Sequence, residues 1–157
     1  MKLAIDLDAV VGDTRRLWEA WLDDAARRFR TIAPLEPASL PRDRGEAAEA
    51  LDRWAAAGVG DWRGALERFA ADHAPLYLRP DPQVNAALRA LAARGATLIA
   101  FTDAPDTLAR LAVAQLGAAR ALEALESASG ALGRALERLG DGAVVVGSRE
   151  ELLRLPL

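Results

Sequence analysis

Three short apolar runs, separated by segments with helical periodicity, constrain the fold of this chain more than any other feature. The runs occupy residues 3–5, 97–101 and 143–146, and residues 122–125 form a weaker candidate. Continuous apolar runs without polar alternation are typical of strands buried on both faces of a parallel sheet. Because helical segments separate the runs, the sequence predicts an α/β fold, with a parallel sheet flanked by helices and right-handed crossovers.

Helical periodicity fills most of the remaining chain. Residues 33–45 contain three prolines and are predicted to be an irregular connection. Apart from this connection, residues 14–78 are expected to be all helical, whereas the rest of the chain alternates between strand and helix. Helices are predicted over residues 14–29, 46–57, 62–73, 82–94, 105–116 and 132–139.

Composition narrows the functional classes. The 157 residues are 52% hydrophobic and 27% charged, which is typical of one globular domain with at most a small appendage. The chain has no cysteine and one histidine, His73, so a metal ion would need oxygen ligands. The net charge of -3 comes without a basic stripe, so nucleic acid is not an expected partner. The N-terminal MKLAIDLD resembles neither a signal peptide nor a membrane anchor, so a cytoplasmic location and no membrane partner are expected.

Acidic residues directly follow the first apolar run. In an open parallel sheet, ligands bind beyond the carboxyl ends of the strands, where Asp6, Thr102 and Gly147 are expected. Asp6 and Asp8 are two residues apart, so both carboxylates can face one site. Their mutual repulsion there favours a bound cation such as Mg²⁺. The alternative is that both acids are solvated loop residues.

The sequence DLDAVVGDT, residues 6–14, resembles the first motif of the haloacid dehalogenase-like superfamily. It matches the motif at Asp6, Asp8 and Asp13. The glycine and threonine that usually follow the second aspartate are alanine and valine here, and neither change removes a reacting group.

This resemblance implies a Rossmann-like core, abbreviated here, with a small all-helical cap inserted after the first strand. The core domain would comprise residues 1–13 and 79–157, and the cap residues 14–78. Relatives usually add a further helix and strand, so the strand at 143–146 is expected to form a sheet edge. Residues 152–157 or a second copy of the protein would then have to cover this edge, which makes a homodimer a hypothesis.

The second and third motifs of the superfamily are matched less well. LIAFTDAP, residues 98–105, resembles the second motif, which implies that Thr102 and Asp103 bind phosphate; alternatively, these residues only form a turn that begins a helix. The third motif requires a lysine, but Lys2 is the only lysine in the chain. Arg134 is the nearest cation and the candidate phosphate-binding substitute, although its position within a predicted helix favours a surface role.

The fourth motif normally places one or two aspartates after the last core strand. Here the sequence is VVVGSREELL, with Ser148 at the position of the first aspartate. Ser148 and Glu151 also have the spacing of a capping box, which explains them structurally. Glu150 and Glu151 remain candidate metal ligands, because a glutamate side chain can reach an ion directly or through water.

Two functions are compatible with these motifs. The first is a phosphohydrolase for a small phosphorylated metabolite, in which Asp6 is the nucleophile that forms an aspartyl-phosphate and Asp8 is the general acid and base. A weakly bound Mg²⁺, held by Asp6 and the Asp8 carbonyl, would assist, and Thr102 would bind phosphate. The second is a degenerate, noncatalytic protein that binds a ligand or partner, since the lysine and the last aspartate are missing. An acid at position 8 argues against dehalogenation.

Overall fold

The computed structural model describes residues 1–156, and over these residues the chain forms an α/β fold with one four-stranded parallel sheet. The strand order is β3-β2-β1-β4, and Leu3 of β1 pairs with Leu98 on one side and Val144 on the other. The predicted fold class is confirmed, and the strand that ends at Asp6 lies in the interior of the sheet. The strands are β1 (Lys2–Asp6), β2 (Thr97–Phe101), β3 (Ala124–Glu126) and β4 (Val144–Val146).

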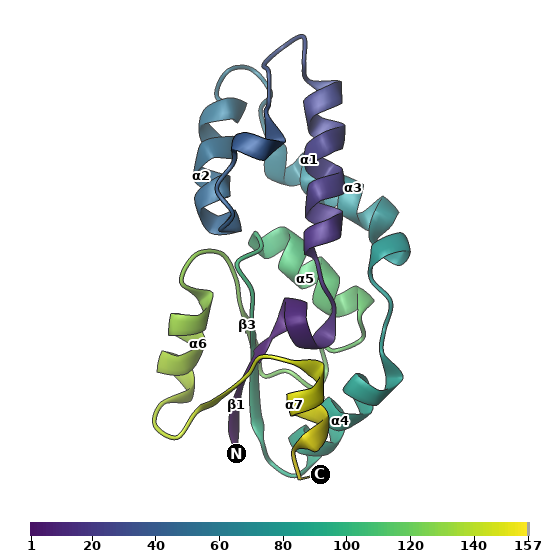
Figure 1. Ribbon diagram of the computed structural model, residues 1–157, viewed down its shortest axis with the longest axis vertical. Coiled ribbons are helices and arrows are strands. Elements are labelled where there is room, and N and C mark those ends of the chain that lie inside the picture. The colour runs from purple at the N-terminus through teal and green to yellow at the C-terminus, as the bar shows by residue number, and fades with distance from the viewer. Residues whose placement is uncertain (157) are drawn as a thin grey trace.

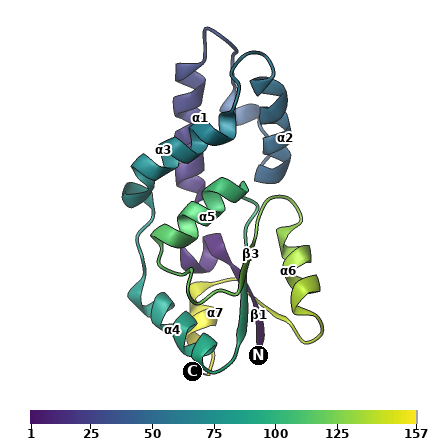
Figure 2. The same ribbon diagram turned by 180° about the vertical axis from the view of Figure 1, so that it is seen from behind.

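Helices cover both faces of the sheet, as the buried apolar runs require (Figures 1 and 2). On one face, Ala135 and Leu139 of α6 pack against Ala4 and Ile99. On the other face lie three further helices and the main hydrophobic core. The four helices are α6 (Ala131–Leu139) on the first face, and α4 (Pro82–Ala93), α5 (Asp106–Gln115) and α7 (Arg149–Arg154) on the second.

The segment that we call the helical insertion, residues 14–78, lies at one end of the molecule, above α5 in Figure 1. It consists of α1 (Arg15–Arg28), a short 3-10 turn (Pro37–Ser39), α2 (Arg44–Ala55) and α3 (Trp62–Tyr77). Its core is aromatic: Trp21 packs against both Trp18 and Trp62, with ring centroids 5.6 Å apart in each pair. The helical prediction is thus confirmed, while the division into a core and a cap domain stays a prediction.

Some boundaries differ from the sequence prediction. Helix α2 begins at Arg44, two residues earlier than expected, because the carboxylate of Asp43 accepts a hydrogen bond from the backbone N–H of Glu46 and caps the helix. Strand β3 lies at residues 124–126 instead of 122–125. A π-helical turn over Leu7–Val11, directly after β1, was not expected at all.

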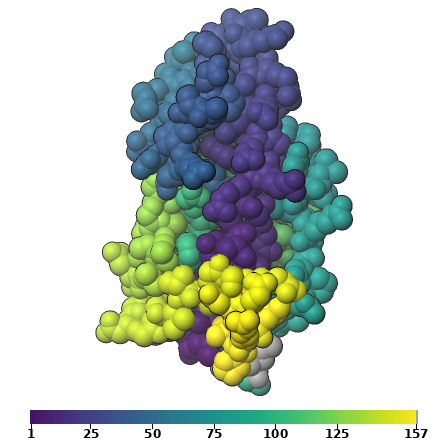
Figure 3. Space-filling view, in the orientation of Figure 1, coloured from purple at the N-terminus to yellow at the C-terminus, as the bar shows by residue number. Residues whose placement is uncertain are grey.

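Ser148 caps the last helix as predicted, but the Glu151 side chain accepts from Gly147 and not from Ser148. The Ser148 hydroxyl accepts from the backbone N–H of Glu151, and the Glu151 carboxylate accepts from the N–H of Gly147. Figure 3 shows the C-terminal segment, in yellow, crossing the front of the molecule just below the purple N-terminal segment. Leu152 is fully buried, but Val144 of β4 remains 52% exposed, so the predicted self-association at this edge stays a prediction.

Residue 157, part of the predicted core domain and edge cover, lies outside the described residues. Within residues 1–156, no helix combines the length and apolar character needed to cross a membrane.

Gly133 provides a test of the helical assignment for α6. It lies inside this helix on the exposed side, and a Cβ atom there would meet nothing within 4 Å. We expect Gly133→Ala to raise the free energy of unfolding by about 0.5–1 kcal/mol in urea denaturation, because alanine loses less backbone entropy on folding. As a control, Gly95→Ala should lower it, because Gly95 has a φ of +83°. A loss of stability in Gly133→Ala would contradict the assignment.

Candidate active site

The carboxylate of Asp6 lies at the carboxyl end of the central strand, where the sheet rule placed the site. The chain turns directly into the π-helical turn, and an Asp6 oxygen accepts a hydrogen bond from the backbone N–H of Ala9 at 3.1 Å. Asp6 is half-buried. Burial and the negative charge of Asp8 raise the pKa of Asp6 above its ordinary value, although the Ala9 hydrogen bond opposes the shift.

Asp8 is buried, and both of its carboxylate oxygens have partners. One oxygen accepts from the backbone N–H of Thr14 at 2.8 Å and from the Thr14 hydroxyl at 2.5 Å. The other accepts from the Thr102 hydroxyl at 2.7 Å and from Nη2 of Arg44 at 2.8 Å. Burial by itself would raise the pKa of Asp8, but the charge of Arg44 and the hydrogen bonds outweigh it. The pKa therefore lies below its ordinary value.

Arg44, the first residue of α2, joins the helical insertion to this site. Its side chain is only 3% exposed. Besides Asp8, its Nη1 donates to the Thr14 hydroxyl at 2.7 Å and its Nη2 to the Thr102 hydroxyl at 3.2 Å. Asp103 accepts from Nε at 2.9 Å and lies 2.8 Å from Nη2, and its second oxygen accepts from the backbone N–H of Arg44 at 3.1 Å. One guanidinium thus links two carboxylates of the core.

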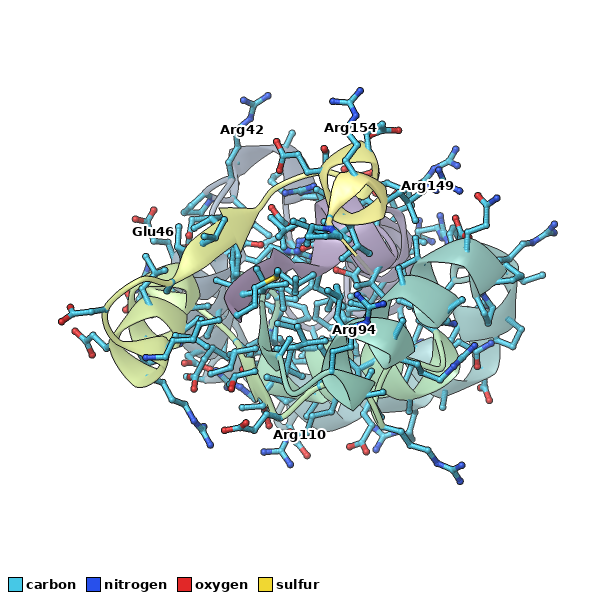
Figure 4. The ribbon with its side chains drawn as sticks, turned by 90° about the horizontal axis from the view of Figure 1, so that it is seen from below. Arg42, Glu46, Arg94, Arg110, Arg149 and Arg154 are labelled. Carbon is cyan, nitrogen blue, oxygen red and sulfur yellow. The ribbon has the colours of Figure 1, made fainter. Side chains whose placement is uncertain are left out.

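The direction of Arg44 is unusual for its segment. Arg42 and Glu46, two residues before and after it, both project outward at the edge of the molecule (Figure 4). The sequence prediction assigned residues 33–45 to an irregular connection and gave Arg44 no role. Only the Asp43-x-x-Glu46 spacing, a helix N-cap pattern, could have placed Arg44 in the first turn of a helix.

A second contact holds the same end of α2 against the core. The hydroxyl of Ser129 donates to Asp43 at 2.8 Å. Gly45 lies so close to Ser129 that a Cβ atom at position 45 would overlap the Ser129 backbone nitrogen. Ala128, the preceding residue, adopts a φ of 65°, a left-handed conformation that is uncommon for a residue with a Cβ atom. The tight loop before α6 therefore packs directly against the first turn of α2.

A cavity of about 230 Å³ opens at the Asp6 carboxylate. A larger groove of about 600 Å³ runs between α1 and the connection to α2, and Arg44 lines it. The two cavities adjoin, because Arg15, Asp43 and Asp103 line both. The smaller cavity is acidic: Asp6, Asp8, Asp43 and Asp103 line it, and Arg15 is the cation among its lining residues.

Four of the predicted site residues lie together. Asp6, Asp8, Thr102 and Asp103 all line the smaller cavity. Arg134, the predicted substitute for the missing lysine, instead donates to the backbone carbonyls of Ser127 and Ser129 and to the carboxylate of Glu126. These contacts stabilise the loop before α6.

The two glutamates predicted as metal ligands lie on α7. The Glu151 carboxylate is bound to the Gly147 N–H, and Glu150 is exposed. The roles predicted for all of these residues, from nucleophile to metal ligand, stay predictions.

The donor set does not fit a divalent cation well. Within the described residues, no group of three or more His, Cys, Asp or Glu side chains is arranged to hold a metal ion. Asp8 is already paired with the Arg44 guanidinium, whose positive charge would repel a second cation. The Ser148 hydroxyl, at the position where the resemblance implies an acid, caps α7 instead. Of the four aspartates described around the smaller cavity, Asp6 and Asp43 have no charged partner in hydrogen-bond contact.

No protein-family model matches the chain, and no curated protein matches it.

Proposed function

We propose that this protein is a phosphohydrolase of the haloacid dehalogenase-like type, which acts on a small phosphomonoester through an aspartyl-phosphate on Asp6. The observation that carries the proposal is the position of the Asp6 carboxylate, at the carboxyl end of the central strand and at the wall of a cavity shared with Asp8 and Thr102. A half-buried carboxylate with a cavity in front of it can approach a phosphorus atom. The enclosure of Asp6 also differs from what is expected of an acid in a solvated loop.

The proposed reaction has two steps. First, an Asp6 oxygen attacks the phosphorus atom, the bond from phosphorus to the leaving oxygen breaks, and Asp8 gives its proton to that oxygen. Second, Asp8 takes a proton from water as the water oxygen attacks phosphorus, and the phosphoenzyme bond breaks to release inorganic phosphate. The Thr102 hydroxyl donates to Asp8 in the absence of substrate and can turn to a phosphoryl oxygen.

The sizes of the adjoining cavities support a small substrate. The inner cavity of about 230 Å³ suits the phosphoryl group, and the outer groove of about 600 Å³ suits an organic part no larger than a small metabolite. The apolar residues Trp18 and Leu22 line this groove beside Arg15 and Arg42, so it offers both apolar and charged contacts.

A noncatalytic binding protein is the second candidate, and the Asp8–Arg44 ion pair favours it. A general acid must carry a proton when the leaving group departs. Since Arg44 holds the pKa of Asp8 low, Asp8 is ionised at neutral pH for as long as the pair persists. Turnover therefore requires that Arg44 leaves Asp8, whereas simple binding in the cavity does not.

Replacement of the proposed nucleophile tests the enzymatic function. We expect Asp6→Asn to lower the hydrolysis of phosphomonoesters at least about a thousandfold, because the amide cannot form the covalent intermediate. The measurement is phosphate release from a panel of small phosphomonoesters, with and without Mg²⁺. The control Asp23→Asn changes an exposed acid on α1 and should leave the rate unchanged. If the unmodified protein hydrolyses none of the panel, the enzyme proposal is wrong and the binding protein remains.

A further inference from the structure

We propose that Arg44 supplies the positive charge that a divalent cation would otherwise provide, so that this site binds a phosphoryl group without metal. The inference rests on the proposed phosphate site and names the residue that makes it work. It also accounts for a difficulty in the sequence, which has no lysine for the third motif and a serine in place of the fourth-motif acid.

The charge of the site requires such a residue. Four aspartates line the inner cavity, and a phosphoryl group would bring further negative charge. Binding in a partly buried site is unfavourable unless cations balance these charges. Arg15 lines the cavity but is exposed to solvent, which weakens its effect. The guanidinium of Arg44 is enclosed, so its field is screened far less.

The geometry of Arg44 suits this role. Its Nη2 lies 2.8 Å from Asp8 and 3.2 Å from the Thr102 hydroxyl, and both partners line the inner cavity, while Arg44 itself lines the outer groove. It therefore lies beside the volume that the phosphoryl group would occupy. A guanidinium has several N–H donors, so Arg44 can donate from Nη2 to a phosphoryl oxygen while its other nitrogens keep Asp103 and Thr14, which a lysine ammonium cannot do in this geometry.

The partners of Arg44 allow it to change acceptor. If Nη2 turns from Asp8 to a phosphoryl oxygen, Asp8 keeps the backbone N–H and the hydroxyl of Thr14 as donors. The contacts of Nε and the backbone N–H with Asp103 keep Arg44 in place during this exchange. The same contacts explain why a divalent cation is a poor substitute: it would have to displace a guanidinium held by two carboxylates.

Calorimetric titration with inorganic phosphate tests the inference directly. We expect the full-length protein to bind phosphate in EDTA, with a dissociation constant that added Mg²⁺ changes by less than about twofold. Arg44→Gln should weaken binding between about tenfold and a hundredfold, as expected for the loss of charge-assisted hydrogen bonds. Arg44→Lys, which keeps the positive charge but loses the planar set of N–H donors, should weaken phosphate binding less. The control Arg53→Gln removes an exposed arginine of the same helix and should have no effect.

Each outcome separates the inference from the proposed function. No phosphate binding in EDTA, binding that depends on Mg²⁺, or equal binding by Arg44→Gln and the unmodified protein would overturn the role of Arg44. The first two results need no variant, so they stand even if Arg44→Gln fails to fold. Phosphate binding through Arg44 without turnover of any phosphomonoester would support the role of Arg44 and contradict the proposed enzymatic function.

Discussion

Asp8→Asn is expected to lower the free energy of unfolding at pH 7 by about 3 kcal/mol, the lower end of the cost of breaking a buried ion pair. The amide cannot balance the charge of Arg44, and its NH₂ group would face donors from Thr14 or Thr102. The cost stays at the lower end because Arg44 keeps Asp103 as an ionic partner. Urea denaturation measures the loss, and a variant as stable as the unmodified protein would show that the pair contributes nothing.

The neighbouring variant Asp6→Asn should have the opposite effect at pH 7. Burial raises the pKa of Asp6, so the folded state favours its protonated form, and the stability due to Asp6 falls as the pH rises from the unfolded value toward the folded one. Above this pH range the charged carboxylate destabilises the folded state, and replacement by asparagine removes that cost. The side-chain oxygen of asparagine can still accept from the backbone N–H of Ala9. A higher melting temperature at pH 7 is the expected result.

The pH dependence of the two acids has opposite signs. Because the pKa of Asp8 is lowered in the folded protein, its contribution to stability is fully present above the ordinary value of 3.8 and is lost as the pH falls through the folded pKa. The destabilisation caused by Asp8→Asn should therefore shrink in acid. A destabilisation that grew as the pH fell would contradict this assignment of charges.

Gly45→Ala is expected to detach the first turn of α2 from the core. The new methyl group would overlap the backbone nitrogen of Ser129, so either the loop or the helix must move, at a cost of about 1–3 kcal/mol or more. The movement would pull Arg44 away from Asp8, and the amides of α2 should exchange faster in hydrogen-exchange measurements.

Gly133→Ala is the matched control for this substitution, since it also adds a methyl group within a helix but meets no neighbour. It should slow exchange in α6 or leave it unchanged. Helix propensity alone would predict a gain in stability for both variants. A gain for Gly45→Ala, with unchanged exchange in α2, would therefore show that the insertion is not seated on the Ser129 loop.

Much of the sheet follows from local sequence, because β1 and β2 are continuous apolar runs that end in polar residues. Once these strands are parallel and adjacent, Asp6, Asp8 and Thr102 must meet at one edge, so this part of the site could be predicted. The prediction for strand β3 began two residues too early, because this strand is short and only partly buried and its apolar run is weak.

Arg44 could not be predicted in the same way. Its partners Asp8 and Asp103 lie 36 and 59 residues away in the sequence, and no local pattern encodes a contact at that separation. The capping pattern at Asp43 fixes where the helix begins but not which side chain turns inward. The inward direction of Arg44 depends on how the helical insertion packs against the core, which is a property of the whole fold.

The central position of β1 has a consequence for the order in which the chain can fold. This strand is synthesised before its neighbours β2 and β4, which begin only at residues 97 and 144. Its apolar residues Leu3, Ala4 and Ile5, which are completely buried in the folded protein, must wait unpaired until most of the chain has been made. Closing such long loops is slow. Refolding should accordingly be slower than for a helical bundle of this length.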